Sequence, residues 1–301
     1  MLKSAFRYFA EVAQHGSIRA AANDLGVAQS AVSRQIQALE REFGAPLLER
    51  RPRGIALTPA GELVFSYARE AAFNVDRLHT EIDALKGLRR GRVRIHAVEA
   101  LVPHLLPQVI NGFLAEFPGI NFDVEIASSD RIHTALRNGQ AEIGIGFWPG
   151  QPKGLRTVFR VQEALLAMVA PDHPLASRRK ISVRELEVWP TAIPNVMSGS
   201  RNLIDSVCQE AEVELRPALE TNSTELLRRF ALVGHGVAVL TRLSCVESLR
   251  SRELVALRFQ EPEMTRGTIE VVTLAGRRLP LPAERFLVPL RRALDMPEHF
   301  A

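Results

Sequence analysis

The sequence has few of the residues that mark secreted or membrane proteins. Only two cysteines occur among 301 residues, Cys208 and Cys245, so a disulfide framework is excluded and two reduced, packed thiols are expected. No apolar run approaches the roughly 18 residues of a membrane-spanning helix, and Lys3, Arg7 and Glu11 interrupt any signal-peptide core. These absences predict a cytoplasmic chain with no membrane partner.

Signatures of catalysis and of metal binding are also missing. The chain has no G-x-S-x-G motif and no P-loop, and the Gly-Ile-Gly of residues 144–146 lacks the rest of a dinucleotide fingerprint. The eight histidines show no metal-ligand spacing. We therefore expect no catalytic residues, no metal and no cofactor, and a two-domain α/β enzyme is the least favoured alternative.

What the sequence does contain is ordinary in amount but uneven in position. An apolar fraction of 46% and a charged fraction of 24% are typical of a soluble globular protein, and 301 residues suffice for more than one domain. The net charge of +4 is only mildly basic. The arginines, however, gather at two places in the chain, Arg50, Arg51 and Arg53 and then Arg89, Arg90, Arg92 and Arg94.

Residues 17–43 form the most informative stretch, because they predict two helices joined by a short turn. Ser17 can cap the first helix, and Gly26 can adopt the positive φ that the turn needs. The second helix carries one apolar stripe of four residues, Val32, Ile36, Leu39 and Phe43. Such a pair is typical of a helix-turn-helix that enters the major groove of DNA.

The face opposite that stripe is polar. Arginine and glutamine can bond to guanine and adenine edges, and serine is adaptable. The alternative is an ordinary helical hairpin with a solvated outer face. The candidate DNA-contacting residues of this segment are Ser17, Gln29, Ser30, Ser33, Arg34 and Gln37.

The flanking segments favour the DNA-binding interpretation. Apolar residues recurring from Leu2 to Ala13 predict a first helix that braces the pair. Two short apolar runs, residues 47–50 and 55–58, bracket an Arg-Pro-Arg-Gly turn and predict a hairpin. Its arginines, Arg50, Arg51 and Arg53, suit contact with phosphates or with the minor groove.

This order of elements, followed by Leu-Thr-Pro-Ala-Gly-Glu at residues 57–62, resembles the N-terminus of LysR-type transcriptional regulators. Residues 31–40 are highly similar to the recognition helix of that family. Ala28 stands where the family usually has serine or threonine, and it cannot cap the helix, a loss of about 1 kcal/mol. Ser30 stands where proline is usual, so the operator preference can differ.

The resemblance also implies a dimer, built on a long linker helix that we expect from Pro59 to Lys86. Apolar residues repeat there at alternating steps of four and three, which is the seam of a coiled coil. The alternative is a single helix packed on its own domain. The candidate dimer residues are Val64, Ala68, Ala71, Val75, Leu78, Ile82 and Leu85.

The remaining chain alternates strand-like and helical patterns. Strands near 93–98, 122–127 and 143–147, separated by helices, predict a parallel sheet with right-handed crossovers. A second set of elements follows, and a strand near 268–274 returns to the first. We therefore expect an α/β fold with an N-terminal all-α winged helix-turn-helix, and the resemblance implies a two-lobed sensor domain similar to periplasmic binding proteins.

The expected domains are a winged helix-turn-helix over residues 1–58, a linker helix over 59–87 and an effector-binding domain over 88–301. Lobe I spans about 91–162 and 267–298, and lobe II about 163–266. Ligands of open α/β sheets bind beyond the carboxyl ends of strands. That rule selects the candidate effector-binding residues Glu99, Ala100, Ser128, Ser129, Trp148, Asn195, Ser200 and Thr221. Phe147, Ser198, Asn222 and Ser223 stand beside them at the same strand ends.

Glu99 is unusual at this place, because the family commonly has hydroxyl residues there. A carboxylate attracts an amine and repels an acid, so a zwitterionic or amine-bearing effector is expected, with Trp148 as an apolar or cation-binding wall. The alternative is that Glu99 faces solvent or pairs with His104 or a nearby arginine. The sequence thus predicts a ligand-responsive regulator that binds double-stranded DNA as a homodimer or homotetramer, with RNA polymerase as a further partner. A constitutive DNA-binding regulator without an effector is the alternative.

Overall fold

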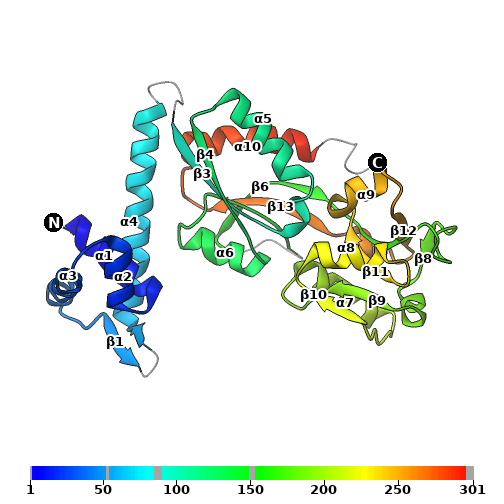
Figure 1. Ribbon diagram of the computed structural model, residues 1–301, viewed down its shortest axis with the longest axis horizontal. Coiled ribbons are helices and arrows are strands. Elements are labelled where there is room, and N and C mark those ends of the chain that lie inside the picture. Colours follow the sequence, from blue (N-terminus) through cyan, green and yellow to red (C-terminus); the bar gives the residue numbers. More distant parts are fainter. Residues whose placement is uncertain (1, 52–53, 85–89, 149–152, 296–301) are drawn as a thin grey trace. The chain divides into compact units, whose positions relative to one another are not determined.

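The computed structural model describes residues 2–51, 54–84, 90–148 and 153–295 (Figure 1). The chain divides into two compact units, residues 1–79 and 80–301. The first unit contains a winged helix-turn-helix, which we call the reading head, together with most of the long helix that follows it. The second contains two α/β lobes. No helix of the described ranges combines the length and the apolar character that a membrane span requires.

The reading head forms where the sequence predicts it. Its elements are α1 (Leu2–His15), α2 (Ile18–Leu25), α3 (Gln29–Phe43), β1 (Leu48–Arg51) and β2 (Gly54–Leu57), followed by α4 (Pro59–Ala84). The two strands pair antiparallel as the wing. Thr58 caps α4 by accepting a bond from the N–H of Gly61 at 3.0 Å, with Pro59 as the first helical residue.

The core of the reading head lies between its three short helices. Phe9 and Val12 of α1 pack against Val32 and Leu39 of α3, and all four are buried. Phe43 departs from the predicted stripe, because its side chain is 47% exposed. It is the last residue of α3, beyond the reach of the core, and its ring lies 6.3 Å from that of Phe6.

Lobe I is built on a five-stranded sheet. Its elements are β3 (Gly91–Ala97), η1 (Glu99–Leu101), α5 (Leu105–Glu116), β4 (Ile120–Ile126), α6 (Ser129–Arg137), β5 (Ile143–Phe147), β6 (Leu155–Gln162), β13 (Thr268–Leu274) and α10 (Leu281–Leu294). The strand order is β4-β3-β5-β13-β6. The first three are parallel, as predicted, whereas β13 runs antiparallel to β5 and to the unpredicted β6. The sheet lies between α5 and α10 on one face and α6 on the other (Figure 1).

Lobe II has a six-stranded sheet in the order β10-β9-β11-β7-β12-β8. Its elements are β7 (Leu165–Val169), β8 (Lys180–Ile181), η2 (Val183–Val188), β9 (Thr191–Pro194), α7 (Gly199–Glu210), β10 (Leu219–Thr221), α8 (Thr224–Leu232), β11 (Val237–Thr241), η3 (Leu243–Cys245), α9 (Val246–Arg250), β12 (Val255–Phe259) and η4 (Pro262–Thr265). Strands β9, β10 and β11 are mutually parallel, and the sequence did not predict β8 and β12.

The chain passes between the two sheets twice, first between β6 and β7 and later between η4 and β13. The two passages lie side by side, because the N–H of Glu163 donates to the carbonyl oxygen of Gly267 at 2.8 Å. The Glu163 carboxylate is 1% exposed and accepts a bond from the N–H of Leu243 at 2.9 Å. Burial raises the pKa of this carboxyl to about 7.

Candidate functional site

The start of α3 follows the sequence closely. Ser17 caps α2 by accepting a bond from the N–H of Ala20 at 3.3 Å, and Gly26 ends that helix at a φ of 64°. Ala28 precedes α3 and makes no side-chain cap bond. The first N–H groups of α3 therefore lack the acceptor that a serine or threonine would supply.

The outer face of α3 is exposed and polar. Gln29, Ser30, Arg34 and Gln37 are exposed, and Ser33 is half-buried. The guanidinium of Arg34 folds back on its own helix, where Nε donates to the carbonyl oxygen of Ser30 at 3.3 Å. This long bond leaves the rest of the guanidinium at the surface. Ser17 is half-buried at the start of α2, where its hydroxyl serves as the cap.

Hydrogen bonds from the main chain of the wing hold it against the helices. The Glu40 carboxylate of α3 accepts bonds from the N–H groups of Leu47 at 2.9 Å and Leu48 at 3.4 Å. On the other strand, the N–H of Ile55 donates to the carbonyl oxygen of Gly16 at 2.9 Å. A Cβ at Gly54 would lie 2.8 Å from that same oxygen, and its φ is 127°, so this position requires glycine.

Of the three wing arginines, one can be placed by its side chain. Arg51 is exposed and pairs with Glu49 of the same strand at 2.5 Å. Such an exposed pair contributes little to stability and is readily exchanged for another anion. The side chain of Arg50 and the whole of Arg53 lie outside the described residues.

The linker helix α4 uses part of its predicted seam within one chain. Val64 and Ala68 are buried, and Val64 packs in the core of the reading head. These two residues therefore brace the helix on its own domain, which corrects their assignment to a dimer seam. Ala71 and Val75 are half-buried, and Leu78 is 55% exposed. The side chain of Ile82 and the whole of Leu85 lie outside the described residues.

Two exposed apolar residues on α4 escaped the sequence analysis. Leu63 is 75% exposed and Tyr67 is 60% exposed. With Ala71 and Leu78 they form one stripe, because steps of four and seven residues return to the same side of a helix. This stripe is rotated from the predicted seam and shares Ala71 and Leu78 with it.

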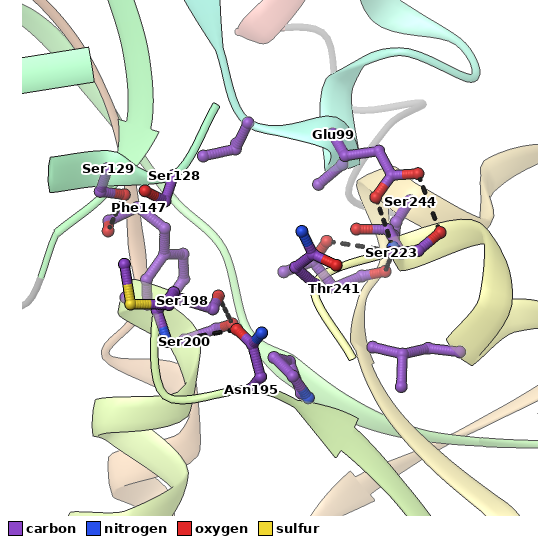
Figure 2. Close-up of a pocket in the computed structure, with 18 of the residues that line it drawn as sticks. Glu99, Ser128, Ser129, Phe147, Asn195, Ser198, Ser200, Ser223, Thr241 and Ser244 are labelled. Carbon is purple, nitrogen blue, oxygen red and sulfur yellow. Dashed lines mark hydrogen bonds between the residues drawn. The ribbon is translucent and has the colours of Figure 1, made fainter. Parts of the chain in front are cut away.

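A cavity of about 490 Å³ lies between lobe I and lobe II (Figure 2). We call it the interlobe pocket. Seven of the eight predicted effector-binding residues line it, namely Glu99, Ala100, Ser128, Ser129, Asn195, Ser200 and Thr221. Ser198, Asn222 and Ser223, which stand at the same predicted strand ends, line it too. The remaining polar lining residues were not predicted, namely Arg131, Thr224, Thr241 and Ser244.

Trp148 does not line the interlobe pocket, which corrects its assignment as a pocket wall. Its indole is buried in a hydrophobic cluster of lobe I with Ile132 and Leu136 of α6. A Cβ at Gly146 would lie 2.6 Å from this ring, so the strand leaves room for it. The preceding Phe147 lines the pocket instead.

One end of the pocket is formed by the start of α6. The hydroxyl of Ser129 donates to the carbonyl oxygen of Phe147 at 2.9 Å, whereas the buried hydroxyl of Ser128 has no partner among the residues that the structure describes. Nearby, the hydroxyls of Ser198 and Ser200 at the start of α7 lie 2.8 Å apart and bond to each other (Figure 2). The N-termini of α6 and α7, together with the unbonded hydroxyl of Ser128, can therefore receive an acidic group at this end.

Glu99 lies at the opposite side of the pocket in Figure 2. Its carboxylate accepts bonds from the hydroxyl of Ser223 at 3.3 Å and from the N–H of Thr224 at 2.5 Å. Neither His104 nor an arginine is its partner, contrary to the alternative considered from the sequence. His104 instead pairs with Glu247 of lobe II, with Nδ1 and Oε1 2.9 Å apart.

Both cysteines lie in lobe II, where burial governs their chemistry. Cys208 and Cys245 are buried free thiols, as predicted, and burial raises the pKa of each to about 11. Both groups are therefore poor nucleophiles at neutral pH. Among the described residues, Glu11, His15 and Asp24 offer ligand atoms within 4.8 Å of one another, and the His15 ring lies 3.6 Å from the Glu11 carboxylate and 3.8 Å from that of Asp24.

Two family models match the chain. The model described as "Bacterial regulatory helix-turn-helix protein, lysR family" matches residues 4–62. The model described as "LysR substrate binding domain" matches residues 86–295, which is more than half of the chain.

Similar curated proteins cover nearly the whole chain. An uncharacterized HTH-type transcriptional regulator of Mycobacterium tuberculosis is 29% identical over 293 residues, covering 94% of each chain. A probable nitrogen assimilation transcriptional activator of Synechococcus elongatus is 29% identical over 288 residues, covering 94% of this chain and 92% of the relative.

Solved structures share the fold. A full-length OxyR variant from Pseudomonas aeruginosa aligns with a TM-score of 0.73 at 22% identity, covering 98% of this chain and 95% of that one. Full-length CbnR in complex with its target DNA aligns with a TM-score of 0.65 at 22% identity, covering 97% of this chain and all (100%) of CbnR.

Proposed function

Because the chain belongs to the LysR family of transcriptional regulators, we propose that it reads a double-stranded DNA operator with α3 and responds to a small molecule in the interlobe pocket. The interlobe pocket carries the second half of this proposal. It brings seven residues selected at strand ends to one cavity between two lobes. Binding there would bias the arrangement of the lobes and thereby the DNA-bound state, at which RNA polymerase is the expected partner.

We propose that Arg34 and Ser33 read base edges from the exposed face of α3. Arg34→Ala should weaken binding to the specific operator by roughly 2 kcal/mol and relax the preference at one base pair, because a bidentate contact is lost. Fluorescence anisotropy with operator variants measures both effects. The change at Arg7 of α1, Arg7→Ala, removes the same charge from another helix of the reading head and should leave the base preference intact.

The assignment of α3 depends on the pattern of these losses. If Arg34→Ala lowered affinity equally for operator and for random DNA, Arg34 would be a phosphate contact and base reading would lie elsewhere. A reduced salt slope accompanies the loss of a phosphate contact, so titrations at several salt concentrations separate the two roles.

We propose that the exposed stripe of α4 carries self-association, as a homodimer or as part of a homotetramer. Leu78→Asp should raise the dissociation constant roughly tenfold or more, about 1.4 kcal/mol, because it places a charge in an apolar contact. Analytical ultracentrifugation measures the change. Ala72→Asp adds the same charge at an exposed position outside the stripe and should have little effect, and equal weakening by both variants would contradict the stripe.

The pocket's charges support an effector with one acidic group and one hydrogen-bond-donating or cationic group. The starts of α6 and α7 favour the acid, and the Glu99 carboxylate at the other side favours the donor. A thermal-shift screen of amino-acid-like compounds and dicarboxylates against the full chain tests this, because a ligand that binds only the folded state raises its stability. Stronger stabilisation by simple dicarboxylates would contradict the zwitterionic class, and no stabilisation by any metabolite would favour the constitutive alternative.

A further inference from the structure

Glu99 connects the two lobes, because its carboxylate binds the N-terminus of a helix in the other lobe. It belongs to η1 of lobe I, directly after β3, whereas its partners Ser223 and Thr224 form the start of α8 in lobe II. The bond from the Thr224 N–H is 2.5 Å long and the bond from the Ser223 hydroxyl is 3.3 Å long (Figure 2). The two lobes are thereby joined without a small molecule between them.

The chemistry of this contact is that of an anion bound at a helix N-terminus. The first N–H groups of a helix lack intrahelical partners and carry a partial positive charge, so a carboxylate there is stabilised. In α8, a nine-residue helix, the hydroxyl of Ser223 also accepts a bond from the N–H of Leu226 at 3.3 Å. Glu99 and Ser223 together therefore supply acceptors for two N–H groups in the first turn of α8, those of Thr224 and Leu226.

The opposite end of the pocket differs in one respect. Within the described part of the chain, the buried hydroxyl of Ser128 has no partner there, and the hydroxyls of Ser198 and Ser200 bond to each other. The pocket thus has one helix N-terminus already occupied by a carboxylate of the protein and another region with hydroxyl groups still available. The two ends are not equivalent for an incoming acid.

Two further contacts hold the lobes together on the Glu99 side. Leu243 of η3 is buried in the hydrophobic cluster of lobe I, and the segments η1 and η3 contact each other. The contact of His104 Nδ1 with the Glu247 carboxylate spans the same junction. Glu99 is therefore part of a junction that is already closed.

We propose that Glu99 acts as an internal ligand of α8, which ties lobe I to lobe II and excludes a second acidic group from that end of the pocket. The exclusion of a second acidic group rests on the proposed effector site, whereas the link between lobe I and lobe II does not. A tethered carboxylate has a high effective concentration, so a free acid competes poorly for the same N–H groups. An effector's acidic group must then bind at the Ser128 end.

Acetate is the probe that tests the internal ligand. Glu99→Ala removes the carboxylate and leaves space for a free one, whereas Glu99→Gln fills the space without charge. Both tryptophans, Trp148 and Trp189, lie in the two-lobed unit, so their fluorescence follows its thermal unfolding in the full chain. The midpoint of Glu99→Ala should fall by roughly 3 °C or more. About 0.1 M sodium acetate should recover much of the loss relative to sodium chloride of equal ionic strength.

The wild type and two further variants show whether the recovery by acetate is specific to the loss of the Glu99 carboxylate. The wild type and Glu99→Gln should gain less from acetate than Glu99→Ala does, because the α8 site is filled in both. Acetate bound at the Ser128 end would raise the midpoints of all three proteins alike. Asp130→Ala removes an exposed carboxylate at the start of α6 and controls for the loss of charge beside the pocket. It should show no acetate rescue.

Hydrogen exchange locates the effect. Amides of residues 223–226 should exchange faster in Glu99→Ala and Glu99→Gln than in the wild type, and acetate should slow them again in Glu99→Ala. If Glu99→Ala does not fold, faster exchange in Glu99→Gln supports the tie and unchanged exchange overturns it. Equal acetate stabilisation of wild type and Glu99→Ala, or an unchanged midpoint and exchange in Glu99→Ala, would also overturn the proposal. A failed effector screen leaves these results intact, so the two proposals fail separately.

Discussion

Gly199→Ala is expected to lower the free energy of unfolding of the two-lobed unit by about 3 kcal/mol, because a side chain there overpacks a backbone contact. Gly199 is the first residue of α7 in lobe II, and a Cβ on it would overlap the carbonyl oxygen of Phe147 in lobe I. That oxygen already accepts a bond from Ser129 at 2.9 Å. Since both colliding parts are main chain, relief requires a shift of α7 or of β5.

Urea unfolding followed by tryptophan fluorescence measures this loss in the full chain, since both tryptophans belong to the two-lobed unit. Gly112→Ala is the matched control. Gly112 lies within α5, and a Cβ there would meet nothing within 4 Å. That change should stabilise by up to about 1 kcal/mol through helix propensity. A neutral or stabilising effect of Gly199→Ala would show that the two lobes do not meet at this point.

Glu163→Gln is expected to change how stability depends on pH. Burial raises the pKa of Glu163 from 4.5 to about 7 in the folded chain. The protonated form is therefore favoured by folding, and this contribution is fully present below pH 4.5 and is lost as the pH rises through 7. The loss amounts to about 3 kcal/mol between pH 4 and pH 8. Glutamine does not titrate and can still accept the bond from the N–H of Leu243.

The measurement is urea unfolding of both proteins at a series of pH values. Glu163→Gln should gain stability over the wild type as the pH rises, by up to about 3 kcal/mol at pH 8. Glu116→Gln, which replaces an exposed carboxylate of α5, controls for the loss of one negative charge. Parallel pH profiles of wild type and Glu163→Gln would contradict the prediction.

The reading head could be predicted from the sequence because its signals are local. Ser17 and Gly26 define the ends of α2 within ten residues, and their cap and positive φ are found in the structure. The absence of a cap bond at Ala28 was equally predictable, since alanine has no side-chain acceptor. Such features depend on near neighbours in the chain, which a sequence displays directly.

The strand-end rule worked for the pocket where strands were recognised. It selected Ser128 and Ser129 in lobe I and Asn195, Ser200 and Thr221 in lobe II, and all of them line the cavity. Thr241 directly follows residues 237–240, which have the pattern of a strand, so the same rule applied there would also have selected it. The rule misplaced Trp148 because β5 is buried on both faces, so its sequence gives no alternation from which to infer where the next side chain points.

The role of Glu99 could not be predicted, because its partners lie 124 and 125 residues away along the chain. The side of α4 that packs on the reading head posed the same difficulty. A heptad pattern shows that Val64 and Leu78 share a face of the helix. It does not show that Val64 is buried by contacts within its own domain. Long-range packing decides such assignments, and one sequence does not contain it.

The bond between Glu40 and the base of the wing has a consequence for how operators can vary. Glu40 belongs to the recognition helix, and its carboxylate fixes the main chain of Leu47 and Leu48 at the entrance to β1. A rotation of the helix in the groove therefore carries the wing with it. In the proposed DNA-bound state, the spacing between the bases that α3 reads and the backbone that the wing touches is therefore fixed within each reading head. Tolerance for operators with longer or shorter gaps between half-sites must then reside in the connection between heads.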